Sequence, residues 1–124
     1  MIIKPRRCFM GAVMGERTTV AEVSRPVAPI HQVLGALQDP IRLEIVRRLA
    51  NAGGPVRCVD LYDGISKSTA THHFNLLRDA GLMERHVVDG YVCQQLRMLE
   101  IEAALPGVLG SIVAQANREA GHDA

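Results

Sequence analysis

The sequence predicts a mostly α-helical protein with one small β-hairpin, and three observations indicate this fold class. Apolar residues recur at helical spacing in several segments, and Asp89-Gly90 lies between two segments that alternate with period two. Gly53-Gly54-Pro55 separates two of the helical segments. The chain has 124 residues, of which 48% are hydrophobic and 22% charged, values typical of a single soluble globular domain. No apolar run approaches the ~18–20 residues of a membrane-spanning helix, so we expect no membrane partner.

We expect residues 1–26 to form a flexible N-terminal tail and residues 27–120 to form one domain. Residues 1–26 show no sustained hydrophobic period and end at Arg25-Pro26. A basic start followed by a seven-residue apolar run has no small-residue cleavage site after it, so we interpret it as tail and not as a signal peptide. Met10 and Met14 are candidate internal start sites, which would leave residues 1–13 out of the cellular protein.

Two helices are predicted in the first half of the domain. The first follows Pro29, because one apolar stripe repeats at i, i+3, i+4 and i+7. The second begins at Asp39-Pro40, where Asp is a favoured N-cap and Pro a favoured first helical residue, and it ends before Gly53. The apolar residues of the first stripe are Ile30, Val33, Leu34 and Leu37.

A third helix is predicted from Lys67 to Ala80, with Ser66 as its N-cap and Gly81 after its end. Before it, residues 56–58 are extended, residues 59–63 suffice for little more than one helical turn, and Gly64-Ile65 forms a corner. Its predicted buried residues are Ala70, His73, Phe74 and Leu77. Its opposite face carries Lys67, Ser68, Thr71, His72 and Asn75.

A β-hairpin is predicted from Met83–Val88 and Tyr91–Leu96 with Asp89-Gly90 as its turn, because Asp-Gly fits the tight turn that joins two strands. This register pairs residue 86 with residue 93 and residue 88 with residue 91. We expect the core-facing residues to be Met83, Val87, Val92 and Leu96, and the outer residues to be His86, Val88, Tyr91 and Cys93.

Two C-terminal helices are predicted, over residues 97–104 and 106–119. The second, together with the residue before it, has the most continuous apolar stripe in the chain: Leu105, Val108, Leu109, Ile112, Val113 and Ala116. A matching stripe lies in residues 30–37, so we expect a homodimer formed through the N- and C-terminal helices. The alternative is that the C-terminal stripe packs only within its own domain.

The order of short helix, glycine-containing turn and polar-faced helix predicts a helix-turn-helix, and the hairpin that follows makes it winged. A helix of this kind fits the major groove of double-stranded DNA, where base edges present distinct donor and acceptor patterns. A net charge of +1 excludes a polybasic coat for nucleic acid, and 3% aromatic residues exclude a stacking platform for single strands.

The candidate DNA-binding residues are Lys67, Ser68, Thr69, Thr71, His72, Asn75 and Arg85, with Asp89 and Gly90 at the wing tip along the flanking DNA. The alternative for this helix face is an ordinary solvated surface.

Two stretches, LGALQDPIRLEIVRRLA (Leu34–Ala50) and STATHHFNLLRDAGLMER (Ser68–Arg85), resemble the ArsR/SmtB family of dimeric bacterial winged-helix regulators. The resemblance covers roughly residues 28–100. It implies a cytoplasmic repressor that binds a palindromic operator as a homodimer and releases it when an effector, here unidentified, binds. The segment from Leu61 to Ser66 is shorter than in the family pattern, which implies a truncated first helix of the helix-turn-helix.

No metal site and no cofactor are expected. Many family members carry Cys-x-Cys where this chain has Arg57-Cys58-Val59-Asp60, and others use Asp and His in the last helix, where residues 106–119 have neither. The three cysteines, Cys8, Cys58 and Cys93, are sparse and odd in number, which favours a reducing cytosol.

Cys93 and His86 are candidate redox-sensor residues, because an imidazolium beside a thiol can lower the thiol pKa. Cys58 is a further sensor candidate. The alternatives are an ordinary half-exposed cysteine at 93 and a small core residue at 58.

We expect a regulator and not an enzyme, because the sequence contains no phosphate loop and no nucleophile-base-acid set. Two alternatives stay open. One is a winged-helix protein-interaction module without DNA binding, which the low net charge and the shortened helix favour. The other is a thiol- or metal-responsive variant of the regulator.

Overall fold

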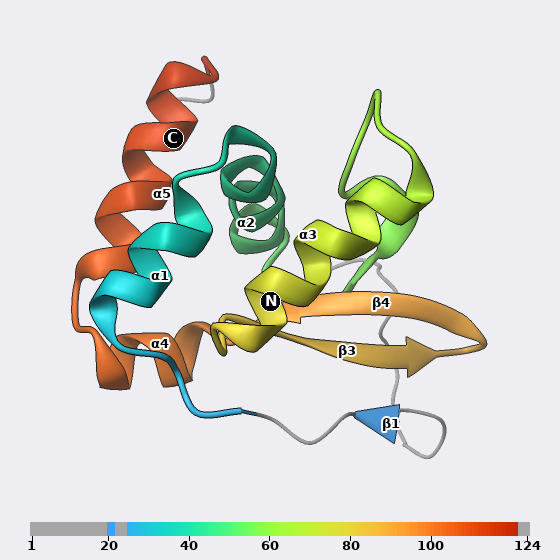
Figure 1. Ribbon diagram of the computed structural model, residues 1–124, viewed down its shortest axis with the longest axis horizontal. Helices are drawn as coiled ribbons and strands as arrows, with labels where there is room; N and C mark the ends of the chain where they lie inside the picture. Colours follow the sequence, from blue (N-terminus) through green and yellow to red (C-terminus); the bar gives the residue numbers. More distant parts are fainter. Residues whose placement is uncertain (1–19, 22–24, 122–124) are drawn as a thin grey trace.

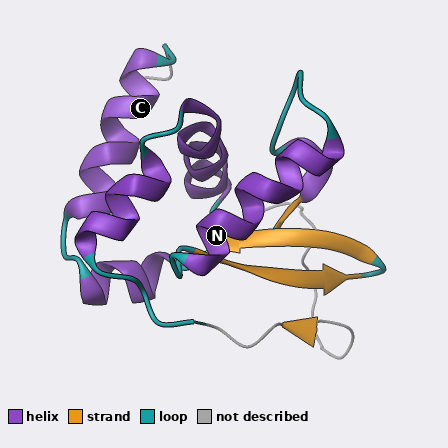
Figure 2. Cartoon of the chain, in the orientation of Figure 1, coloured by secondary structure: helices purple, strands orange, loops and turns teal. Residues whose placement is uncertain are grey.

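The computed structural model describes residues 20–21 and 25–121. Its helices are α1 (Ile30–Leu37), α2 (Pro40–Ala52), the 3-10 helix η2 (Cys58–Asp60), α3 (Lys67–Asp79), α4 (Met98–Ala104) and α5 (Val108–Glu119). Its strands are β1 (Val20–Ala21), β2 (Val56–Arg57), β3 (Met83–Val88) and β4 (Tyr91–Leu96). The long β3–β4 hairpin extends at one end of the molecule, and α1 and α5 lie at the other, with α3 between them (Figure 1; Figure 2). The predicted fold class, mostly helical with a hairpin wing, is confirmed. None of the described helices is long and apolar enough to cross a membrane.

Helix α2 starts and ends where the sequence predicts. The Asp39 side chain accepts hydrogen bonds from the backbone N–H groups of Ile41 and Arg42, at 2.8 and 3.1 Å. Pro40 occupies the first helical position, and Gly53 ends the helix in the left-handed conformation with φ of 72°. Both ends are thus capped by residues suited to these positions.

Arg48, held by Glu44, connects α2 to the segment that follows η2. The Glu44 carboxylate accepts from Arg47 at 2.7 Å and from Arg48, its i+4 neighbour, at 2.8 Å. Arg48 also donates to Asp63 at 2.6 Å, on the turn before α3. The hydrogen bonds from the arginines, Arg47 first, lower the pKa of Glu44 to about 2. The network therefore holds the turn of the helix-turn-helix against α2.

Glu44→Gln is expected to destabilise the protein by about 1 kcal/mol at pH 7, because this pair is partly solvated and water screens it. The folded-state pKa of Glu44 is depressed, so its contribution is present above the unfolded pKa and lost as pH falls toward about 2. Urea unfolding should therefore give a difference between wild type and Glu44→Gln that shrinks between pH 5 and pH 2. A difference that stays constant over this range would contradict the assignment.

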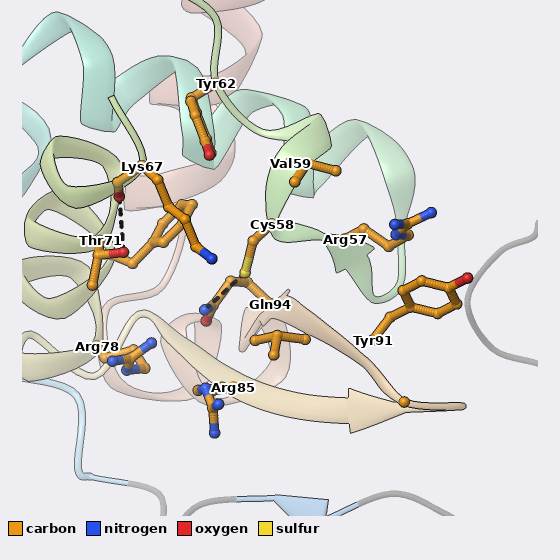
Figure 3. Close-up of a pocket in the computed structure, with 13 residues that line it drawn as sticks. Arg57, Cys58, Val59, Tyr62, Lys67, Thr71, Arg78, Arg85, Tyr91 and Gln94 are labelled. Carbon is orange, nitrogen blue, oxygen red and sulfur yellow. Dashed lines mark hydrogen bonds between the residues drawn. The ribbon is translucent and has the colours of Figure 1, made fainter. Parts of the chain in front are cut away.

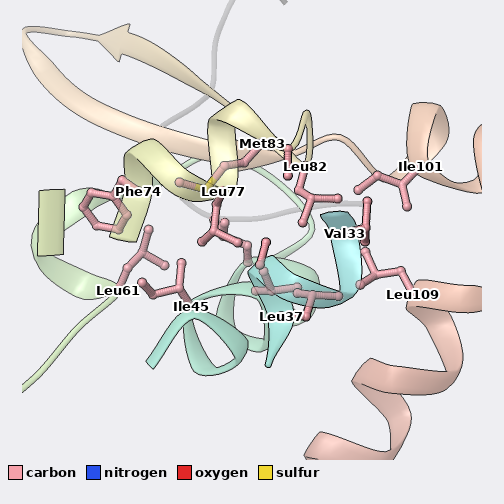
Figure 4. Close-up of a cluster of buried hydrophobic side chains, with 14 of the residues drawn as sticks. Val33, Leu37, Ile45, Leu61, Phe74, Leu77, Leu82, Met83, Ile101 and Leu109 are labelled. Atoms are coloured by element: carbon pink, nitrogen blue, oxygen red, sulfur yellow. The ribbon is translucent and has the colours of Figure 1, made fainter. Parts of the chain in front are cut away.

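The hydrophobic core lies between α1, α2, α3 and the C-terminal helices (Figure 4). Val33, Ile45, Leu77, Ile101 and Leu109, from five different helices, are each at most 1% exposed. The predicted stripe of residues 30–37 is only half buried: Val33 and Leu37 face the core, whereas Ile30 and Leu34 are 41% and 49% exposed.

The buried face of α3 is the predicted one: Ala70, His73, Phe74 and Leu77. Arg42 Nη1 lies 3.0 Å from His73 Nδ1. A guanidinium can only donate, so Nδ1 accepts and the ring proton is on Nε2. His73 is thus a core histidine that connects α3 to α2.

The sheet order is β1-β3-β4-β2. The hairpin has the predicted register, with His86 opposite Cys93 and Val88 opposite Tyr91. Asp89 and Gly90 have φ of 52° and 83°, so both take the positive values that this tight turn needs.

The predicted burial of the hairpin faces was wrong at Cys93 and at Val92. Cys93 is fully buried, whereas Val92, assigned to the core, is 38% exposed. In the sheet Cys93 has a neighbour on each side, Arg57 of β2 and His86 of β3, so β4 is a central strand at this position. Toward the hairpin tip the strands extend away from the core, which leaves Val92 exposed. Met83 is buried as predicted, and Leu96 is half buried against the core.

The last helix starts later than the sequence predicts, and most of the predicted tail cannot be compared with the structure. Helix α5 begins at Val108 and not at Pro106, because Gly107 takes a left-handed φ of 78° as its N-cap. Most of the predicted tail, residues 1–26, lies outside the described residues. Val20–Ala21 form the short strand β1, which pairs with Val87 and His86.

Candidate nucleic-acid interface

Helix α3 presents its polar face to solvent. Successive residues of a helix turn by about 100°, so positions i, i+4 and i+7 form one face. The predicted residues Lys67, Ser68, Thr69, Thr71, His72 and Asn75 are all exposed. Their predicted surface position is confirmed, and their contact with DNA stays a prediction.

The hydroxyl groups at the start of α3 already cap the helix. Ser66 Oγ accepts from the N–H of Thr69 at 3.1 Å and donates to Thr69 Oγ1 at 2.9 Å. Ser66 and Ser68 hydroxyls lie 3.2 Å apart, and Thr71 Oγ1 donates to the carbonyl of Lys67 at 2.9 Å. Thr71 is therefore left with acceptor capacity and a methyl group.

Three longer side chains of this face differ in their partners. Asn75 Oδ1 accepts a hydrogen bond from Arg78, so a bidentate contact of Asn75 with an adenine would displace Arg78. The side chains of Lys67 and His72 make no hydrogen bond within the described part of the chain. These two are the side chains most ready to bond a phosphate or a base edge.

A groove of about 450 Å³ separates α3 from the hairpin (Figure 3). Four of its 13 lining residues are basic and none is acidic. The basic residues are Arg57, Lys67, Arg78 and Arg85. Arg57 also lies 3.9 Å above the centre of the Tyr91 ring. Positive charge is thus concentrated beside the exposed face of α3, although the whole chain has a net charge of only +1.

Arg85 and the wing tip differ in exposure. Asp89 and Gly90 are exposed at the tip, whereas Arg85 is half buried in the groove, opposite Gln94 on β4. Sequence reasoning missed Arg57 and Arg78 as members of this basic surface. Arg78 follows Lys67 by eleven residues, three helical turns, and that spacing was a usable signal.

The candidate sensor residues have environments that do not favour a reactive thiol. Cys93 was expected on the outer face of the wing and is instead fully buried. His86 Nε2 lies 3.2 Å from a Glu84 carboxylate oxygen. Burial raises the pKa of the Cys58 thiol, whose Sγ accepts from Gln94 Nε2 at 3.5 Å. A raised pKa keeps the Cys58 thiol protonated and weakly nucleophilic.

The remaining site predictions concern metal and the first cysteine. Among residues 20–21 and 25–121, no three His, Cys, Asp or Glu side chains gather where they could hold a metal ion. Cys8 lies outside the described residues.

Two comparisons with known proteins match the segment that contains this surface. The helix-turn-helix domain family matches residues 37–86, from the end of α1 into β3. The uncharacterized HTH-type transcriptional regulator YceK of Bacillus subtilis (strain 168) is 34% identical over 83 residues. The aligned segment covers 65% of this chain and 83% of that relative.

Proposed function

The chain belongs to the helix-turn-helix transcriptional regulators, and from this membership we propose that it is an ArsR/SmtB-type repressor that binds a palindromic operator as a homodimer. The observation that carries the proposal is the exposed polar face of α3. It is the second helix of the helix-turn-helix and has a hairpin beside it.

The dimensions and chemistry of α3 suit a major groove. Its 13 residues give a rod about 20 Å long, and the groove of B-DNA is about 12 Å wide. Short side chains at Ser68, Thr69 and Thr71 allow the rod to approach closely, while Lys67 and His72 supply donors. The N-terminus of α3 also offers backbone N–H groups to a phosphate. We assign base reading to the 67–75 segment and backbone contacts to Arg85 and the wing tip.

The dimer would form through α1 and α5. Val33 of α1 and Leu109 of α5 belong to the same core, and both helices lie at the end opposite the hairpin (Figure 1). Ile30 and Leu34 of α1 remain 41% and 49% exposed in the single chain. Pairing there buries this apolar surface and leaves both copies of α3 free to meet successive major grooves, about 34 Å apart.

Leu34→Glu is expected to convert the dimer to a monomer, because it places a charge in the proposed apolar interface. Light scattering coupled to size exclusion should give about twice 13.5 kDa for wild type and about 13.5 kDa for the variant. Leu99→Glu is the matched control, since Leu99 is 85% exposed on α4, and it should remain dimeric. A dimeric Leu34→Glu would rule out this interface.

The DNA-binding proposal is tested with labelled duplexes from the region upstream of the protein's own gene. Fluorescence anisotropy at several salt concentrations should show tight binding to one duplex and a steep loss of affinity with salt. Each phosphate contact contributes about −0.9 to the slope of log K against log salt. A protein-interaction module would instead show no duplex binding at moderate salt.

A further inference from the structure

We propose that the groove between α3 and the β3–β4 hairpin is a binding site for a small organic anion with an apolar body, and that its occupation weakens DNA binding. The effect on DNA binding rests on the proposed function, whereas the anion site depends on the groove alone.

The positive charge of the groove favours an anionic ligand. Its basic lining residues come from three elements: Arg57 of β2, Lys67 and Arg78 of α3, and Arg85 of β3. No Asp or Glu is among the lining residues. The Cys58 thiol, also in the lining, has a raised pKa and is therefore uncharged. Like charges held near each other in one hollow attract a counter-ion of opposite charge.

The apolar side chains of the groove favour a ligand that has an apolar body as well as a charged group. Six large hydrophobic residues of the described chain are exposed, and three of them, Val59, Tyr91 and Val92, line this groove. The phosphodiester backbone of DNA has little apolar surface to bury against these side chains. An aromatic or aliphatic acid can bury its apolar body against them. The hollow of about 450 Å³ is within the usual range of about 300–1,000 Å³ for small-molecule sites.

The floor is preorganised and contains a polar group with unused capacity. Tyr62 and Phe74 pack edge to face with ring centroids 6.2 Å apart. Gln94 is 1% exposed, and its Oε1 has no hydrogen-bond partner in the described structure while Nε2 bonds Cys58. A buried amide oxygen without a donor is costly, and a ligand that carries a hydroxyl or amine group could satisfy it after a small adjustment.

The groove adjoins the proposed DNA-reading face and shares Lys67, Thr71 and Arg85 with the proposed DNA contacts. Lys67, Thr71 and Phe74 lie on its side of α3, whereas Ser68, His72 and Asn75 point about 100° away. An anion here would neutralise the basic surface beside α3 and place a negative charge near the DNA backbone. Occupation should therefore lower DNA affinity by reducing phosphate contacts.

The test uses the fluorescent anion 8-anilinonaphthalene-1-sulfonate and its uncharged analogue N-phenyl-1-naphthylamine, titrated into the full chain without DNA. The sulfonate should bind at one site per chain, about 10-fold more tightly than the uncharged analogue, because the charged group adds attraction to the arginines. Val59→Asp places a carboxylate in the groove and should weaken the sulfonate about 10-fold relative to the isosteric Val59→Asn. Arg118→Gln, at an exposed position of α5, is the remote control and should bind the sulfonate as wild type does.

Equal sulfonate binding by wild type and Val59→Asp would place the probe elsewhere, such as the exposed α1 surface, and overturn the proposal. Absence of sulfonate binding by the wild type would overturn it as well.

A second arm measures operator affinity at saturating sulfonate, which should fall about 10-fold in wild type and much less in Val59→Asp. Unchanged operator affinity with the groove occupied would overturn the inhibitory role. If the wild type binds no duplex at all, the proposed function fails while the first arm still decides the anion site.

Discussion

Gly81→Ala is expected to destabilise the protein by at least about 3 kcal/mol, which corresponds to a fall in Tm of about 10 °C or more. Gly81 has a φ of +77°, and a Cβ built there would lie 2.3 Å from the carbonyl oxygen of Pro26. It would also lie 2.8 Å from the Cα of Val27, so the clash is with backbone that no side-chain rotation relieves.

The clash would also break hydrogen bonds that hold residues 25–28 across the end of α3. Arg97, which is only 8% exposed, donates from Nη1 to the carbonyls of Gly81 and Arg25. Ala28 N–H donates to the carbonyl of Ala80 at 2.9 Å. A displaced 25–28 segment would leave these groups without partners and would loosen the junction between α3 and β3.

Gly53→Ala is the matched control for Gly81→Ala. Gly53 has a similar φ of +72°, but a Cβ there would meet nothing within 4 Å. Its expected cost is only the left-handed backbone penalty, about 1 kcal/mol. Thermal unfolding followed by circular dichroism compares the two. Equal shifts in Tm would show that the contact with Pro26 contributes nothing.

Lys67→Glu is expected to lower affinity for the operator about 100-fold, because it removes a cation and adds a repulsive charge next to phosphate. Lys67 is the exposed first residue of α3, and its side-chain ammonium group has no hydrogen-bond partner in the described structure. An acidic residue in the first helical turn is favourable to the helix, so the fold should be as stable as wild type or slightly more stable. Loss of binding therefore could not be attributed to unfolding.

Arg118→Glu makes the same change in charge on α5, far along the chain from α3, and should lower affinity less than about 3-fold. Anisotropy titrations at one salt concentration compare the two variants. If Lys67→Glu binds the operator no more weakly than Arg118→Glu does, α3 does not contact DNA through its first turn.

The sequence predicted most of the fold because the local signals agree with the tertiary packing. Asp39-Pro40, Ser66 and Asp89-Gly90 each fix a helix start or a turn through their own backbone preferences, and each is found in that role. The buried stripe of α3 also followed from spacing alone, because a single face of that helix is apolar.

The errors arose where burial depends on segments that are distant in sequence. Cys93 is buried in a central strand between His86 of β3 and Arg57 of β2, and no pattern within residues 83–96 reveals the pairing with β2. Val92 alternates like a core residue but lies where the hairpin extends away from the core. Alternation predicts which residues share a face, and it does not predict which part of the face is covered.

The candidate site was predicted in part for the same reason. The exposed residues of α3 could be read from one helix, whereas the basic groove combines Arg57, Arg78 and Arg85 from three separate segments. A net charge of +1 concealed this local concentration. Charge placement in three dimensions, and not the total, is what matters for an anionic partner.

The most direct measurement of whether α3 reads DNA is the ratio of affinities for the operator and for a scrambled duplex of the same composition. Sequence reading by the 67–75 segment predicts that His72→Ala lowers this ratio about 10-fold, with little change in binding to the scrambled duplex. His72 is exposed, so the far-UV circular dichroism should match that of wild type. A ratio that His72→Ala and Lys67→Ala both leave at the wild-type value would contradict the assignment of α3 as the recognition helix.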